Sequence, residues 1–423
     1  MEIIKKLFGG NLRQFGMLIT LVVLIGFFQV VTGGLVMTPQ NLMNLLNGNS
    51  YILILAIGMV MVIIAGHIDL SVGSVAAVVG ISVAILMRDL GLTGWTGVLV
   101  GILIGLVIGL AIGAWQGFWL AFVGIPGFIV TLSGYLFFRG LNQFIGKSNT
   151  IPVSEEFKVL GAGYLPDWGM VPGLNDSTIV LGLLGIGFVV WQQLRGRARK
   201  LELGAEAPEL WVVVGRIIAF AAVIVYVTFL YASGPAGTSF PVSGLILFAL
   251  VVVYTFVTQR LPIGRHVYAI GGNRNAAELS GVSSRRVYFF VMANMSVLSA
   301  LAGMIFISRS GASGPFDGVG WELDAIAAVF IGGAAVSGGV GTVIGSIIGG
   351  LVMAFLNNGL QLLGTGADVT QMIKGLVLLL AVAVDVWNKT QGRPSITGAI
   401  FRGRKPAPEP APVVEAADTT PAG

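Results

Sequence analysis

Twelve apolar runs, most of them long enough to cross a lipid bilayer, occupy most of this chain. A spanning helix needs about 20 mainly apolar residues. Only 10% of the 423 residues are charged, against about 25% in a soluble domain. We therefore predict an all-α polytopic membrane protein with about twelve transmembrane helices, and exclude a soluble enzyme, a nucleic-acid binder and a disordered chain. The runs are 15–34, 51–65, 74–87, 97–120, 128–145, 177–194, 211–231, 240–258, 287–308, 323–336, 342–363 and 369–387.

Some of these runs are too short to span a bilayer alone. Runs 51–65 and 74–87 form a short pair around the polar stretch 66–73, and run 323–336 is also short. Transporters place interrupted helices where irregular backbone lines a cavity. We therefore predict broken or re-entrant segments at 51–87 and 323–350.

The basic residues predict the orientation of the chain. With twelve spans and a cytoplasmic N-terminus, 18 of the 24 Lys and Arg residues fall on the cytoplasmic side, as the positive-inside rule requires. We predict a multi-pass protein of the cell membrane with a cytoplasmic N-terminus (1–14), a transmembrane domain (15–390) and a cytoplasmic, largely disordered tail (391–423).

The chain lacks the usual signatures of catalysis. It contains no Cys, and its two histidines, His67 and His266, are far apart, so we predict no metal site. The sequence Gly146-Lys147-Ser148 resembles the end of a phosphate loop, but Leu141 stands where that motif needs glycine. We therefore predict no catalytic residues and no cofactor, and we expect any ATP to be hydrolysed by another subunit.

Few ionisable residues lie within the apolar runs, and such residues are functional candidates by default. Asp69 can also be a helix cap, and the ammonium group of Lys374 can reach outward to water. Proton-coupled carriers usually place several acids or histidines at mid-membrane depth. Their scarcity here favours a path lined by backbone, glycine, asparagine and serine. The candidates for that path are Asp69, Ser71, Asn357, Asn358 and Lys374.

The cytoplasmic loop 259–286 is a candidate docking site for a soluble partner. A short Ala/Glu/Leu helix over 274–280, beginning near Asn273 and ending at Gly281, fits this stretch. Small side chains would allow a partner to approach closely, although an ordinary basic loop is the alternative. The candidate docking residues are Gly272, Asn273, Ala276, Ala277, Glu278 and Gly281.

Glycine recurs at every fourth residue from Gly101 to Gly117, and again from Gly341 to Gly349. Small residues at this spacing let helix backbones approach one another in a membrane. We expect these stripes to pack helices within the chain, with a subunit interface as the alternative.

Several motifs together resemble the permease subunits of bacterial ABC importers for ribose, arabinose and xylose. They lie at residues 66–74, 125–132, 138–140, 268–281, 323–328 and 338–341. One departure is Gln116-Gly117, where the family usually has Asn-Gly. The family core has ten spans, so the pair at 177–231 is an insertion. That insertion, with Trp115 and Trp119, is similar to the xylose-type permeases.

The resemblance implies an importer made of several subunits. We expect a homodimer of permeases in membrane lipid, an ATPase subunit docked on loop 259–286, and a periplasmic or lipid-anchored binding protein that delivers a monosaccharide, with xylose first. The resemblance implies no nucleic acid and no cofactor. The alternative is an ion-coupled secondary sugar carrier.

Overall fold

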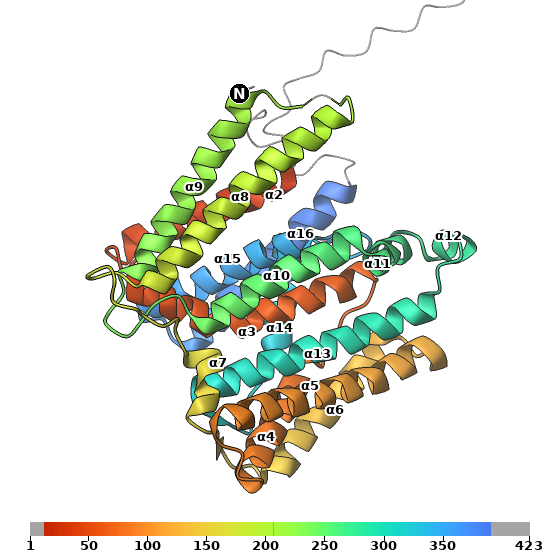
Figure 1. Cartoon of the computed structure of the whole chain (residues 1–423). Coiled ribbons are helices and arrows are strands. Elements are labelled where there is room, and N and C mark those ends of the chain that lie inside the picture. The colour runs from red at the N-terminus through yellow and green to blue at the C-terminus, as the bar shows by residue number, and fades with distance from the viewer. Residues whose placement is uncertain (1–11, 206, 391–423) are drawn as a thin grey trace, which may run out of the picture.

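In the computed structural model, which describes residues 12–205 and 207–390, every one of the twelve apolar runs overlaps a helix (Figure 1). These helices are α2 (Leu12–Val31), α3 (Pro39–Ile64), α4 (Val72–Asp89), α5 (Gly94–Phe118), α6 (Gly127–Gly146), α8 (Asp176–Glu202), α9 (Leu210–Ala232), α10 (Val242–Arg260), α13 (Ser284–Ser310), α14 (Trp321–Ile331), α15 (Val343–Leu362) and α16 (Ala367–Thr390).

Shorter elements occupy the connections. A π-helical turn, η1 (Trp119–Val123), continues α5. The loop after α6 holds β1 (Ile151–Pro152), η2 (Glu156–Lys158) and α7 (Val159–Ala162), and β1 pairs with β2 (Ala312–Ser313). Two helices, α11 (Pro262–Gly272) and α12 (Arg274–Leu279), lie between α10 and α13.

Eight helices of the described chain are long and apolar enough to cross a membrane. They are α3, α4, α5 with η1, α8, α9, α10, α13 and α15. Helix α14 has only 11 residues, as expected for a broken or re-entrant segment. The prediction of an all-α polytopic membrane protein is therefore confirmed.

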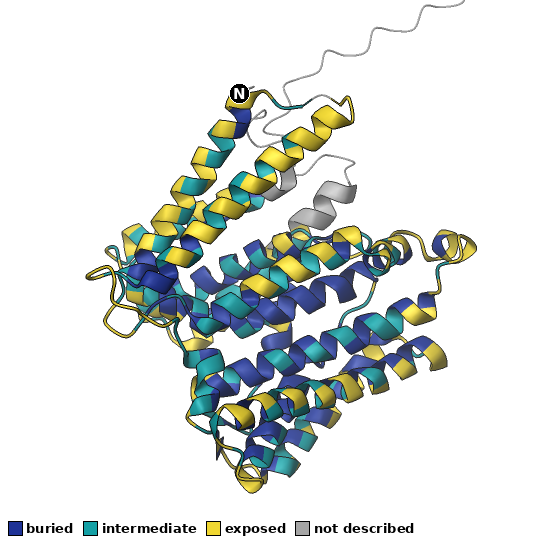
Figure 2. Ribbon diagram, in the orientation of Figure 1, coloured by how far each residue is buried: buried dark blue, intermediate teal, exposed yellow. Residues whose placement is uncertain are grey.

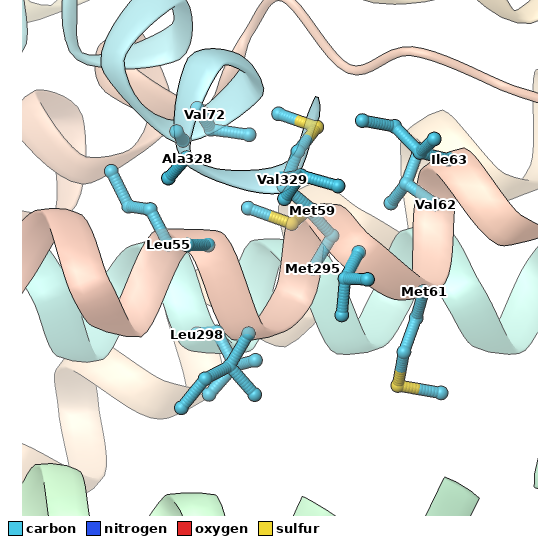
Figure 3. Close-up of a cluster of buried hydrophobic side chains, with 14 of the residues drawn as sticks. Leu55, Met59, Met61, Val62, Ile63, Val72, Met295, Leu298, Ala328 and Val329 are labelled. Atoms are coloured by element: carbon cyan, nitrogen blue, oxygen red, sulfur yellow. The ribbon is translucent and has the colours of Figure 1, made fainter. Parts of the chain in front are cut away.

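Helices α3 and α13 form the centre of the bundle. Figure 2 shows both as mostly buried, and 83% of the apolar window of α3 is buried. Figure 3 shows Leu55 and Met59 of α3 among side chains of α13 and α14, including Met295 and Val329. Because lipid tails are as apolar as these side chains, close packing and dispersion contacts, rather than exclusion from water, stabilise this core.

The prediction that the second span is short is wrong, because α3 begins at Pro39 and has 26 residues. Asparagines between positions 41 and 49 lower the hydropathy of its first half. Two of these polar side chains face other helices of the protein rather than lipid. Asn47 is buried and accepts a 2.8 Å hydrogen bond from the Ser243 hydroxyl, and Asn41 exchanges two 2.8 Å hydrogen bonds with Asn358 of α15.

Both glycine stripes pack helices of the same chain. A Cβ atom at Gly109 of α5 would lie only 2.5 Å from the Cβ atom of Ala300 on α13. A Cβ atom at Gly349 of α15 would meet the backbone of Ala328 and Gly332. The prediction of packing within the chain is confirmed, and the alternative of a subunit interface is wrong for these two stripes.

Helices α8 and α9 form an antiparallel pair that leans away from the rest of the bundle (Figure 1). Only 17% and 11% of their apolar windows are buried. The Asn175 side chain caps α8 by accepting a 2.9 Å hydrogen bond from the Thr178 amide. Because so little of their surface is buried, α8 and α9 lie at the side of the bundle and contribute little to its core.

Candidate functional site

A polar cavity of about 550 Å³ opens at the end of the bundle opposite α12. Its walls come from the first half of α3, the second half of α15, the start of α16, and the N-terminus of α14. Most of its polar side chains carry amides or hydroxyls. They are Asn44, Asn49, Tyr51, Asn357, Asn358, Gln361, Thr365, Thr370 and Gln371, together with the charged residues Arg309, Asp324 and Lys374.

Several polar groups of the cavity are not used by the protein itself. The Oδ1 atom of Asn357 and the Oγ1 atom of Thr370 are buried and have no hydrogen-bond partner among the described residues. A buried polar atom without a partner costs about 1–3 kcal/mol. Both atoms therefore have hydrogen-bonding capacity that no described residue uses, in side chains that line the cavity.

An ion pair joins two helices at the cavity wall. Nζ of Lys374 on α16 lies 2.5 Å from Oδ1 of Asp324 on α14, and both side chains are about one-fifth exposed. The ammonium group of Lys374, for which reaching outward to water was the alternative, is held in this ion pair. The pair neutralises both charges and ties α14 to α16.

An irregular segment, residues 311–320, leads into α14. Nη1 of Arg139 on α6 donates a 2.6 Å hydrogen bond to the Asp317 carbonyl. Gly318, with a φ of 79°, packs its backbone directly against the backbone of Gly73. These contacts hold the start of the short helix inside the bundle beside the cavity.

Asp69 and Ser71 lie in a second, buried polar cluster away from the cavity. Oδ1 of Asp69 accepts hydrogen bonds from the Ser71 amide (2.8 Å) and the Ser71 hydroxyl (2.6 Å). The Ser71 hydroxyl in turn accepts a 2.7 Å bond from Nε2 of Gln116. Asp69 therefore closes a turn just before α4. This role is similar to the helix cap that was the alternative for Asp69 in the sequence. Gln116, at the position of the family's asparagine, supplies an amide to this cluster.

Two helix breaks, one between α3 and α4 and the other between α14 and α15, meet beside α11. The Gly339 amide donates a 2.9 Å hydrogen bond to the carbonyl of Ile64, the last residue of α3. Gly271 of α11 packs against the same carbonyl so closely that no side chain fits there. The Tyr268 hydroxyl, also on α11, donates a 2.7 Å bond to the Gly341 carbonyl.

The helix predicted over 274–280 is present as α12 (Arg274–Leu279), at the tip of the connection between α10 and α13 (Figure 1). Asn273 caps it by accepting a 3.0 Å hydrogen bond from the Ala276 amide, and Gly281 follows it with a φ of 85°. Hydrogen bonds from Ser284 and Arg274 lower the pKa of the Glu278 carboxyl, so Glu278 stays ionised at neutral pH.

The buried face of α12 changes the expectation for one docking residue. Ala277 is 6% exposed and belongs to the apolar core of its own chain, so it cannot face a partner. Ala276 is exposed, as are Gly272, Asn273 and Glu278. Leu279, which the sequence reasoning did not single out, is 90% exposed. The sequence offered a signal for it, because Leu279 is the one large apolar residue between Ile270 and Val282.

The guanidinium group of Arg274 connects α12 to the first helix break. It lies 5.7 Å from the ring centre of Tyr288 on α13. That ring packs edge-on against His67, with centroids 4.5 Å apart. His67 lies in the irregular segment between α3 and α4, two residues before Asp69.

The predicted site residues fall in two places, the polar cavity and the buried cluster. Within residues 12–205 and 207–390, no cluster of three acidic, His or Cys side chains could hold a metal ion. Of the predicted path residues, Asn357, Asn358 and Lys374 line the cavity, whereas Asp69 and Ser71 lie in the buried cluster. Thr370 and Gln361 also line the cavity, and the sequence reasoning missed both.

Broken helices around a polar cavity define a membrane permease, and comparison with known proteins identifies the family. The sequence model of one protein family, described as the permease component of branched-chain amino acid transport systems, matches residues 41–382. The chain belongs to this family. It is therefore a transport subunit and not an enzyme. No solved structure is significantly similar to the chain.

Named relatives are similar along nearly the whole chain. The xylose transport system permease protein XylH of Haemophilus influenzae is 40% identical over 387 residues, which cover 91% of this chain and 99% of that protein. XylH of Escherichia coli K12 is 40% identical over 89% of this chain and 92% of its own length. The ribose import permease protein RbsC of the same strain is 32% identical over 88% and 93%. The resemblance to sugar permeases is confirmed.

Proposed function

We propose that this chain is the membrane permease of an ATP-driven importer for a monosaccharide, with xylose as the first candidate. The cavity carries the proposal, because its amide and hydroxyl lining suits an uncharged polyol. The names of the 40% identical relatives support xylose. In this scheme an extracytoplasmic binding protein delivers the sugar to the end of the bundle that holds the cavity.

The translocation path would begin at Asn357, Asn358 and Lys374 and continue past α14 toward the helix breaks. Asp69 and Ser71 would support the path by fixing the start of α4, since both are buried and bonded within one cluster. A sugar would then pass along backbone and amide groups.

A second copy of the chain would complete the path. Phe316, Val319 and Leu323, on α14 and the segment before it, are all more than half exposed. Irregular backbone at membrane depth is tolerated only where protein or a water-filled cavity covers it. We therefore place the homodimer contact and the translocation path along the face that carries α14.

The ATPase subunit would dock on α12 at the cytoplasmic end. Leu279 and Ala276 offer it an apolar surface, and Asn273 and Gly281 fix the two ends of the helix. Closure of the ATPase domains would move α11 and α12 and bias the bundle between two states.

The proposal places the chain in the cell membrane with both termini in the cytoplasm. Residues 1–11 and 391–423, which hold most of the N-terminal segment and the whole tail, lie outside the described residues. The hairpin between α8 and α9 carries Arg195, Arg197, Arg199 and Lys200. Such residues attract anionic lipid headgroups with about 1 kcal/mol each.

Reconstitution in liposomes tests the proposed function. The permease with its ATPase and binding protein should take up xylose when ATP is supplied and should ignore an imposed proton or sodium gradient. Uptake driven by an ion gradient without ATP would favour the secondary carrier instead.

Removing the inserted pair should leave transport largely intact. Deletion of residues 177–231 keeps the number of spans even, and α8 and α9 contribute little to the buried core. We therefore expect normal membrane insertion, and ATP-driven uptake within about threefold of that of the full chain. A threefold change corresponds to about 0.6 kcal/mol. A deletion variant that inserts normally but transports nothing would contradict this.

A further inference from the structure

We infer that the cavity between α3, α14, α15 and α16 is a specific binding site for a neutral monosaccharide on the permease itself, with Asn357 and Thr370 as its recognition residues. The inference rests on the proposed function and deepens it. A permease that only conducts sugar would need no more than an open channel. This cavity has three features of a binding site.

The first feature is the pair of unused polar atoms. Asn357 Oδ1 and Thr370 Oγ1 lie on different helices, α15 and α16, and both residues line the same cavity. Both atoms are buried as they stand. Sugar hydroxyls are donors as well as acceptors, so a sugar could satisfy both atoms once a side-chain rotation turns them toward the cavity. The side chains of Gln361 and Gln371 also line the cavity and form no hydrogen bond within the described chain.

The second feature is that neighbouring groups are held in place. Asn358, next to Asn357, is locked by its two 2.8 Å hydrogen bonds with Asn41. Tyr51 and Trp321 at the cavity wall pack with ring centroids 4.4 Å apart, and both contact Phe306. Rigid neighbours lower the entropy cost of binding.

The third feature is charge. Arg309, at the exposed end of α13, lines the cavity as well. On α15 and α16, the helices that carry Asn357 and Thr370, the charged side chain that lines the cavity is Lys374, and its charge is neutralised by Asp324 at 2.5 Å. This part of the wall therefore favours a neutral sugar over a sugar acid. The volume of about 550 Å³ is typical of small-molecule pockets and accommodates a monosaccharide with some water.

A transport site must release its ligand, so binding should be weak, with a Kd on the order of millimolar. Saturation-transfer NMR suits this range. The sample is the full-length permease with its ATPase subunit in lipid nanodiscs, without the binding protein. D-xylose should give saturation transfer, and xylonate, a sugar acid of similar size, should give little.

Substitutions locate the site. Thr370→Val and Asn357→Leu should each weaken xylose binding about 2- to 10-fold, the effect of one neutral hydrogen bond, and Thr370→Ser should retain binding. Thr258→Val is the matched control, because Thr258 is a buried threonine outside the cavity that bonds to its own helix. Elution volume and thermal unfolding establish that each variant is folded.

Three outcomes would overturn the inference: no xylose signal, tighter binding of xylonate, or folded Thr370 and Asn357 variants that bind like Thr258→Val. ATP-driven uptake by the same complex with binding protein is measured in parallel. If uptake persists while direct binding is absent, only this inference fails, whereas loss of ATP-driven uptake in the unsubstituted complex contradicts the proposed function.

Discussion

Leu279→Asp should release the ATPase subunit from the purified complex and abolish sugar-stimulated ATP hydrolysis. Leu279 is a large apolar side chain, 90% exposed, at the end of α12, which makes it the natural anchor for a partner's pocket. Truncating an interface anchor typically costs about 2–4 kcal/mol, and this corresponds to about 30- to 1000-fold in affinity. Co-purification and ATPase assays measure both effects.

A second exposed leucine provides the control for this experiment. Leu203, which follows α8 in the hairpin between α8 and α9, is 74% exposed, and Leu203→Asp should leave the complex unchanged. Both variants should insert normally, because neither side chain packs in the core. If Leu279→Asp keeps the ATPase bound and active, α12 is not the docking site.

Lys374→Met should destabilise the permease and reduce uptake at least tenfold. The substitution leaves the Asp324 carboxylate without its partner at 2.5 Å, in a wall that is only about one-fifth exposed. Removing one member of a buried ion pair costs about 3–5 kcal/mol, and partial exposure places our expectation near the lower end, at about 3 kcal/mol. Thermal unfolding in detergent measures the stability.

Reversing the pair separates charge pairing from other effects. Asp324→Lys combined with Lys374→Asp should recover much of the lost stability, and Asp324→Asn combined with Lys374→Met should be more stable than Lys374→Met alone. If the double variants are no better than the single ones, the two residues do not act as a pair.

Hydropathy predicted the helical fold well because the bilayer imposes a simple rule on lipid-facing helices. It failed at α3, since the asparagines between 41 and 49 lie within a spanning helix but face protein and the cavity. A hydropathy scale counts only apolar residues, so it predicts the end of a spanning helix at the point where polar side chains of a site begin. The wrongly predicted start of this helix therefore coincides with the position of the cavity.

Side-chain direction explains what the sequence left open. Asn357 and Lys374 were identifiable as polar residues within apolar runs, but their neighbour Thr370 resembles any threonine near a helix start. Ala277 and Leu279 are two positions apart on α12 and face opposite ways, one buried and one 90% exposed. Only packing against the bundle distinguishes them.

The contact between Ile64, Gly271 and Gly339 determines how a displacement of α11 is transmitted to the neighbouring helices. Backbone meets backbone there, with no side chain between, so no rotamer change can absorb a displacement. Packed protein interiors have low compressibility and transmit strain. A shift of α11 would therefore move the ends of both helix breaks together, and states in which only one break has moved should be sparsely populated.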